Sequence, residues 1–148
     1  MKIAVSACLT GCNCKYNGGN NLDPELMEML REHEVLTVCP EVLGGLPVPR
    51  IPAEIVSGTV MNAEGSSVDA EFRRGAEIAL RQIREFGAEL VILQPRSPSC
   101  GVGTVYDGSF SGIRVPGNGV FAELLIRTGI RAVDAADRAQ LSRLLKSE

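Results

Sequence analysis

The stretch DAEFRRGAEIALRQIREFGAELVIL, residues 69–93, joins an amphipathic helix to a buried strand. Within residues 69–86, apolar side chains recur at steps of three and four, the spacing of one helix face, and Gly87 then supplies a stop. Residues 89–93 are expected as a strand, because Leu90-Val91-Ile92-Leu93 form a short apolar run after Gly87. A helix followed directly by such a strand favours the α/β class, in which helices lie against a parallel sheet.

The same alternation continues on both sides of this stretch. Further elements are expected as strands at 2–7, 35–38 and 130–133, and as helices from Asp23, over 119–128 with Asn118 as cap, and from Asp134 to Lys146. Two Gly-rich loops interrupt the alternation, at 40–65 and at 97–119, the first with room for short strands and the second with a hairpin around 104–108. The sequence therefore predicts a Rossmann-like open parallel sheet with flanking helices and Gly-rich active-site loops, in a single domain spanning residues 1–148.

Composition and charge restrict the kinds of partner. The net charge of −3 gives no strong indication of nucleic-acid binding. The chain opens with Met1-Lys2 and a short apolar strand, which does not resemble a signal peptide, and no apolar run approaches the ~20 residues of a membrane helix. We therefore expect a cytoplasmic protein that does not bind membranes and acts on a small molecule.

Three of the five cysteines follow apolar runs that are predicted to be strands: Cys8, Cys39 and Cys100. If those strands are neighbours in one parallel sheet, the three thiols meet at the edge where open α/β sheets bind ligands. An odd number of cysteines in a reducing compartment argues against structural disulfides. Three converging thiols suggest a metal or cluster with a free coordination position, although a buried cysteine can also serve simply as a small apolar residue, an equally good interpretation for Cys12.

The spacing of the thiols helps to identify the metal. Cys8, Cys12 and Cys14 form C-x3-C-x-C, one residue short of the cluster-binding run of radical enzymes that use adenosylmethionine, and paired C-x2-C zinc-ribbon motifs do not occur. His33 is the only histidine and is expected at the solvated surface, so a mixed Cys/His zinc site is poorly supported. Ligation by thiolates alone favours iron–sulfur over catalytic zinc.

Several motifs surround these cysteines in a fixed order. They are SACLTG at 6–11, NCKYNGG at 13–19, VCPEVLGGL at 38–46, RSPSCG at 96–101, YDGSFSG at 106–112 and PGNGV at 116–120. Together they resemble the DUF523 family, which includes the thiouracil desulfidases, and the resemblance covers residues 1–134. Two departures could alter substrate preference: Asn17 replaces an aspartate common in the family, and Gln94-Pro95 stand where Lys-Glu is common.

The resemblance implies a [4Fe–4S] cluster held by three cysteines, with the fourth iron open. On the family pattern the ligands match Cys8, Cys39 and Cys100, the same three residues that follow predicted strands. Cys14 also matches a recurrent family cysteine; it is not expected to be a ligand, but to support the site or to pack beneath it. Cys12 stands where the family usually has an aliphatic residue and is the least expected ligand.

An open iron is a Lewis acid that can bind a thiocarbonyl sulfur and polarise its carbon toward attack by water. Glu41, two residues after Cys39, is the expected base, and Ser97 is the expected catalytic hydroxyl. Candidate substrate-binding residues are Ser99, Gly44 and Gly45. The alternatives are a solvated loop carboxylate at position 41 and turn-forming serines beside Pro98.

The resulting hypothesis is an iron–sulfur-dependent desulfidase that breaks a C–S bond without redox chemistry. Its substrate would be a thiolated pyrimidine, either 2-thiouracil or a related thiouracil or thiouridine compound, converted to the oxo base and sulfide. Two alternatives remain: a cluster-dependent lyase or hydro-lyase acting on another small substrate, and a cluster carrier or sensor without catalysis. Glu41 and the neighbouring hydroxyls favour catalysis, because a carrier needs no acid–base group beside its cluster.

Overall fold

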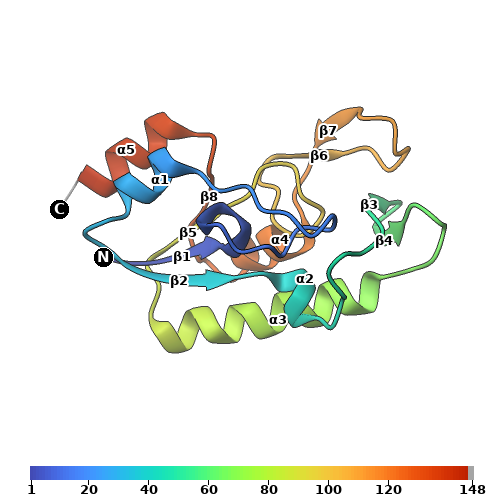
Figure 1. Cartoon of the computed structure of the whole chain (residues 1–148), viewed down its shortest axis with the longest axis horizontal. Helices are drawn as coiled ribbons and strands as arrows, with labels where there is room; N and C mark the ends of the chain where they lie inside the picture. Colours follow the sequence, from blue (N-terminus) through green and yellow to red (C-terminus); the bar gives the residue numbers. More distant parts are fainter. Residues whose placement is uncertain (147–148) are drawn as a thin grey trace.

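Four parallel strands form the centre of the molecule (Figure 1), in the order β2-β1-β5-β8. The structure is a computed structural model that describes residues 1–146. The strands are β1 (Lys2–Ser6), β2 (Glu34–Val38), β5 (Leu90–Leu93) and β8 (Ala132–Asp134). Register pairs Ile3 with both Val35 and Leu90. The predicted α/β class with a parallel sheet and flanking helices is confirmed.

Helices cover both faces of this sheet. On one face lie α3 (Asp69–Phe86) and α4 (Val120–Arg127), and on the other lie α1 (Pro24–Met29) and α5 (Arg138–Lys146). Successive strand residues alternate between the two cores: Ala4 packs with the α3 and α4 side chains, whereas Ile3 and Val5 pack with those of α1 and α5. Two buried faces explain why the inner strands β1 and β5 consist almost entirely of small or apolar residues. Among the described helices, none combines the length and apolarity that crossing a membrane requires.

The direction of strand addition reverses between β1 and β5. From β1 the chain passes through α1 to β2 on one side, and from β5 it passes through α4 to β8 on the other. Ligands of open α/β sheets bind at such a reversal, beyond the carboxyl ends of the strands. Cys8, Cys39 and Cys100 follow β1, β2 and β5, so the topology brings three distant cysteines to the expected crevice.

The two Gly-rich loops contain small elements of their own. The first holds a short helix, α2 (Pro40–Leu43), and the hairpin β3 (Ala53–Val56) with β4 (Thr59–Asn62), so the expectation of short strands there is confirmed. The second holds the hairpin β6 (Thr104–Tyr106) with β7 (Arg114–Pro116), whose loop is longer than predicted. Both hairpins stand beyond the carboxyl end of the main sheet (Figure 1).

Two predicted helix starts are wrong. The N-cap of α4 is Gly119, because the Asn118 side chain is already engaged: its oxygen accepts from the Gly103 amide at 2.8 Å and its nitrogen donates to Glu123 at 3.0 Å. The last helix, α5, begins at Arg138 and not at Asp134. Asp134 ends β8, and its carboxylate accepts from the Ala136 amide at 2.7 Å, which stabilises a turn in place of a helix.

Helix α2 rests on α3 through two facing glycines. A Cβ at Gly75 would lie 1.7 Å from the carbonyl oxygen of Pro40, and a Cβ at Gly44 would lie 1.9 Å from that of Glu71. Both obstacles are backbone atoms, so only a shift of a whole helix could relieve the clash. Because α2 directly follows Cys39 and contains Glu41, this close approach sets the position of one wall of the crevice.

We expect Gly75→Ala to destabilise the fold. Alanine is intrinsically better than glycine inside a helix by about 1 kcal/mol, but the clash with Pro40 should outweigh this gain, because overpacking costs about 1–3 kcal/mol or more. Urea unfolding of the apoprotein under reducing conditions measures the difference. The exposed Arg81→Ala on the same helix is the control and should stay within about 0.5 kcal/mol of the original chain. An unchanged or raised stability for Gly75→Ala would contradict the packing described.

Candidate active site

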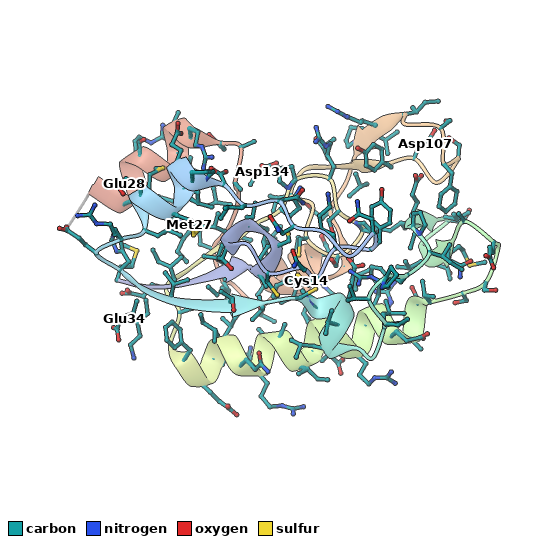
Figure 2. All side chains as sticks on the ribbon, viewed as in Figure 1. Cys14, Met27, Glu28, Glu34, Asp107 and Asp134 are labelled. Atoms are coloured by element: carbon teal, nitrogen blue, oxygen red, sulfur yellow. The ribbon has the colours of Figure 1, made fainter. Side chains whose placement is uncertain are left out.

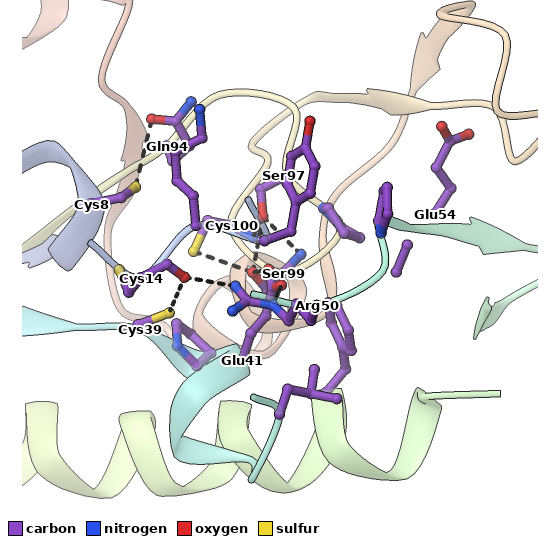
Figure 3. Close-up of a pocket in the computed structure, with 18 of the residues that line it drawn as sticks. Cys8, Cys14, Cys39, Glu41, Arg50, Glu54, Gln94, Ser97, Ser99 and Cys100 are labelled. Atoms are coloured by element: carbon purple, nitrogen blue, oxygen red, sulfur yellow. Dashed lines mark hydrogen bonds and ion pairs between the residues drawn. The ribbon is translucent and has the colours of Figure 1, made fainter. Parts of the chain in front are cut away.

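A cavity of about 980 Å³ opens beyond the carboxyl ends of the central strands. Four cysteines line it: Cys8, Cys14, Cys39 and Cys100 (Figure 3). Three of them are the predicted ligands, and the fourth, Cys14, is buried in the interior of the molecule (Figure 2). Cys12 is exposed and, among the described residues, is not part of the lining. The structure thus brings together all the cysteines of the chain except the one for which a ligand role was least expected.

Weak polar contacts surround three of the four sulfurs. Cys8 Sγ lies 3.9 Å from Gln94 Oε1 and 3.8 Å from Asn21 Nδ2. Cys39 Sγ donates to the backbone carbonyl of Cys14 at 3.9 Å, which joins the first loop to the end of β2. The Ser99 hydroxyl lies 3.6 Å from Cys100 Sγ. The thiols of Cys8, Cys39 and Cys100 each therefore have a polar neighbour from another residue of the crevice.

The close approach of the four thiols, together with their burial, changes their pKa values. A hydrogen bond from Cys14 lowers the pKa of Cys8, with a smaller contribution from Asn21. The pKa of Cys14 is raised to about 12: its hydrogen bond with Cys39 lowers it, but the contact with Cys8 and burial outweigh this. The hydrogen bond with Cys14 and burial also raise the pKa of Cys39. Burial raises the pKa of Cys100 to about 12, with Glu41 adding to the effect.

These residues fit an iron–sulfur cofactor by the chemistry of their donor atoms. Four thiols, the ligand type that iron–sulfur clusters use, converge in this cavity. Several are protonated when no cation is nearby, and a bound cation would draw them into the thiolate form. In the described part of the chain, no group of three or more Cys, His, Asp or Glu side chains is arranged to hold a metal ion. The fit therefore rests on two features: the thiols are of the ligand type that such a cluster uses, and they meet in one cavity.

Glu41 projects from α2 into the same cavity and is held at both oxygens. Arg50 Nε donates to Oε1 at 3.0 Å, and the Ser99 hydroxyl donates to Oε2 at 2.8 Å. The pair is shielded from solvent, since the Arg50 and Glu41 side chains are 7% and 16% exposed. The alternative of a solvated loop carboxylate does not describe Glu41, whose orientation is fixed beside the thiols.

Ser97 and Ser99 form a short hydroxyl chain that leads from Glu41 to Cys100. Their Oγ atoms lie 2.9 Å apart. Ser97 Oγ also accepts from the amides of Ser99 and Cys100, at 3.1 and 3.0 Å, which shapes the loop after β5. The serines therefore stabilise a turn, as the alternative of turn-forming serines predicted. They also connect the Glu41 carboxylate to the loop that carries Cys100.

Gly44 and Gly45 lie outside the described cavity lining. Gly44 is buried against α3, and its carbonyl accepts a hydrogen bond from Arg74, so packing accounts for this residue. Gly45 has a φ of 97°, a left-handed conformation that glycine adopts without strain. Contact of either glycine with a substrate stays a prediction, and these two features give it no support.

Three residues of the site were not anticipated: Arg50, Gln94 and Asn21. Arg50 is an isolated cation after a Pro-rich segment, and this isolation is the only feature of the sequence that could have indicated a role in the site. Gln94 had been noted only as a departure from the family pattern, and the structure places its side chain against Cys8. Asn21 precedes the cap of α1 and carries no pattern of its own. Their side-chain partners in the site, Glu41 and Cys8, lie 9 to 86 residues away in the chain, a separation that spacing arguments do not capture.

The fold and the thiol-lined crevice agree with what sequence comparison finds. Residues 3–137 match the family model described as 2-thiouracil desulfurase. This match covers far more than half of the chain, and the protein therefore belongs to the 2-thiouracil desulfurase family, also called DUF523.

Two relatives extend the comparison. Protein YbbK of Bacillus subtilis (strain 168) is 39% identical over 141 residues, which cover 88% of this chain and 93% of YbbK. The solved structure of the [4Fe-4S]-dependent thiouracil desulfidase TudS is 40% identical, superimposes with a TM-score of 0.91, and covers 99% of both chains. The chain is thus homologous to an iron–sulfur-dependent desulfidase along almost its whole length.

Proposed function

We propose that this protein removes sulfur from a thiolated pyrimidine, such as 2-thiouracil or a related thiouracil or thiouridine compound, giving the oxo base and sulfide. The observation that carries the proposal is the meeting, in one cavity, of four thiols with the fixed Glu41 carboxylate and two serine hydroxyls. The similarity to TudS supports the same reaction class. A volume of about 980 Å³ leaves room for a pyrimidine beside a cofactor.

Cys8, Cys39 and Cys100 are the proposed ligands of a [4Fe–4S] cluster that has one iron without a protein ligand. Such a cluster, when bound, supplies a Lewis-acidic iron with affinity for soft sulfur. Cys14 lies among the ligands, and its backbone carbonyl accepts from Cys39 and from Arg50. We assign Cys14 a supporting role, because its carbonyl ties the ligand-bearing loops together.

The proposed chemistry conserves oxidation state. One water supplies the oxygen of the new carbonyl, and the C–S bond breaks to release sulfide, so no electron donor is needed. Glu41 accepts the proton of the attacking water; each carboxylate oxygen has two lone pairs, so an acceptor position remains beside Arg50 and Ser99. We assign the return of a proton to the departing sulfur to Ser97, whose hydroxyl is joined to Glu41 through that of Ser99.

The contacts of Glu41 favour catalysis over cluster carriage. A carrier gains nothing from a shielded carboxylate held at both oxygens, and shielding a charge from water has a cost that its partners must offset. The same contacts would suit a lyase or hydro-lyase acting on another small substrate. Only the identity of the substrate that the protein converts distinguishes such a lyase from a desulfidase.

The test is a substrate panel offered to anaerobically reconstituted protein. We expect sulfide release and loss of thiocarbonyl absorbance with at least one of 2-thiouracil, 4-thiouracil and 4-thiouridine. Apoprotein prepared in parallel is the control and should convert none. Conversion by the apoprotein at the same rate, or no conversion of any thiolated base by fully loaded protein, would remove the desulfidase assignment.

A further inference from the structure

Arg50 joins two segments of the chain that form the cavity wall. Its Nε donates to Glu41 Oε1 at 3.0 Å, its Nη2 to the carbonyl of Cys14 at 2.8 Å, and its Nη1 to the carbonyl of Pro47 at 3.2 Å. Its backbone amide also donates to the carbonyl of Tyr16, at 2.7 Å. One residue therefore fixes the cysteine-bearing loop after β1 to the segment that follows α2 (Figure 3).

The Arg50 side chain is only 7% exposed, so its charge depends on these partners. A guanidinium offers five donors in a planar fork, and here three of its nitrogens meet three different acceptors. Removing it would leave the Glu41 carboxylate shielded from water without its counter-charge, and leaving such a group unpaired is costly. The planar guanidinium reaches all three acceptors at once, whereas the ammonium of a lysine at this position could reach only some of them.

The contacts of Glu41 extend the connection to the third cysteine. Its second oxygen accepts from Ser99, whose hydroxyl lies 3.6 Å from Cys100 Sγ. A continuous path therefore runs from the Cys14 carbonyl through Arg50 and Glu41 to the loop after β5. Cys39 joins it as well, because its thiol donates to the same Cys14 carbonyl at 3.9 Å.

We propose that Arg50 is a positioning residue for the desulfuration reaction: it orients the Glu41 carboxylate and ties together the loops that carry the cysteines. This inference rests on the proposed function. Arg50 acts through Glu41 and the loops, and it needs no contact with the substrate. Loss of Arg50 should therefore lower kcat with little change in KM. It should also weaken the binding of the iron–sulfur cluster.

The sharpest test is a double-mutant cycle on kcat between Arg50→Met and Glu41→Gln, with iron content matched for every variant. Arg50→Met alone should lower kcat about 10- to 100-fold, as expected when a partner of a reacting group is removed. In the Glu41→Gln background the same substitution should change kcat less than about threefold, because residues that act as a unit are not additive. Arg50→Lys should recover part of the loss. Equal effects in both backgrounds would show that Arg50 does not act through Glu41.

A second readout does not depend on turnover. Arg50→Met should lose iron to a chelator about tenfold faster than the original protein, followed by the fading of its visible absorbance. Arg81→Met, an exposed arginine on α3, is the control and should lose iron at the original rate. If loaded original protein converts no thiolated base, the proposed function fails, and the chelation rates still decide whether Arg50 ties the loops. Equal chelation rates for Arg50→Met and the control would overturn that part of the inference.

Discussion

Replacing Cys8, Cys39 or Cys100 by alanine, one at a time, should abolish stable binding of the iron–sulfur cluster. The original protein, reconstituted anaerobically, should be brown and contain about four irons and four sulfides per chain. Each of the three thiols follows a different strand of the central sheet and lines the same cavity. Losing one of three ligands should leave the cofactor too weakly held to survive gel filtration. Iron and sulfide analysis with visible spectra measures the effect.

Two other cysteines serve as controls for this ligand assignment. Cys12→Ala should keep the full iron content, because Cys12 is exposed and outside the lining. Cys14→Ala should also retain a cluster, since its backbone carbonyl, which accepts from Arg50 and Cys39, survives the substitution. Loss of the cluster in Cys14→Ala together with its retention in Cys8→Ala would transfer the ligand role from Cys8 to Cys14. Stoichiometric zinc without iron would contradict the cofactor itself.

Glu41→Gln should retain the cluster but lower the rate of sulfide release on the order of 10²-fold or more, as expected for loss of a general base. Glutamine has nearly the same size: its amide oxygen can still accept from Arg50, and its NH2 group can donate to the Ser99 hydroxyl oxygen in place of accepting from it, so the wall of the cavity should keep its shape. Only the basic carboxylate is removed. The measurement is anaerobic turnover of a thiolated base, normalised to iron content.

Two comparisons sharpen the interpretation of this variant. Ser97→Ala should also slow turnover, though less, because the Ser99 hydroxyl stays beside Glu41 and Cys100. Glu54→Gln changes another carboxylate of the same cavity, one that accepts from the amides of Gly108 and Phe110 and lies away from the thiols (Figure 3). It should leave kcat within a few-fold of the original value. Full turnover by iron-loaded Glu41→Gln protein would exclude Glu41 as the base.

The fold could be predicted from sequence where periodicity and end signals agree. Residues 69–86 combine a helical apolar pattern with Gly87, and the structure has α3 with these bounds and Gly87 in the left-handed conformation. The short helix α2 was missed, because four residues between Cys39 and Gly44 contain too little pattern to be recognised. Asn118 was misjudged for a different reason: a good capping side chain was already bonded to Gly103, a tertiary contact that local sequence does not reveal.

In the candidate site, too, some residues could be placed from the sequence and others could not. Cys8, Cys39 and Cys100 could be placed together, because the carboxyl ends of parallel strands share one edge, and topology alone then brings the thiols close. The resemblance placed Cys14 in or beneath the site, but its contact with Arg50 could not be predicted, since that contact depends on how two irregular loops fold against each other. The guanidinium contact with the Cys14 carbonyl spans 36 residues between loops without periodic structure. Sequence thus located the crevice, and the structure supplied the contacts that orient Glu41 within it.

The most direct test of the central claim is the anaerobic conversion of 2-thiouracil by cluster-loaded protein in isotopically labelled water without any reductant. We expect repeated turnover, equal amounts of uracil and sulfide, and one labelled oxygen in each uracil formed. Such a result requires hydrolytic cleavage of the C–S bond without net electron transfer. Conversion that stops without a reductant, or uracil whose new oxygen does not come from water, would exclude hydrolytic desulfuration.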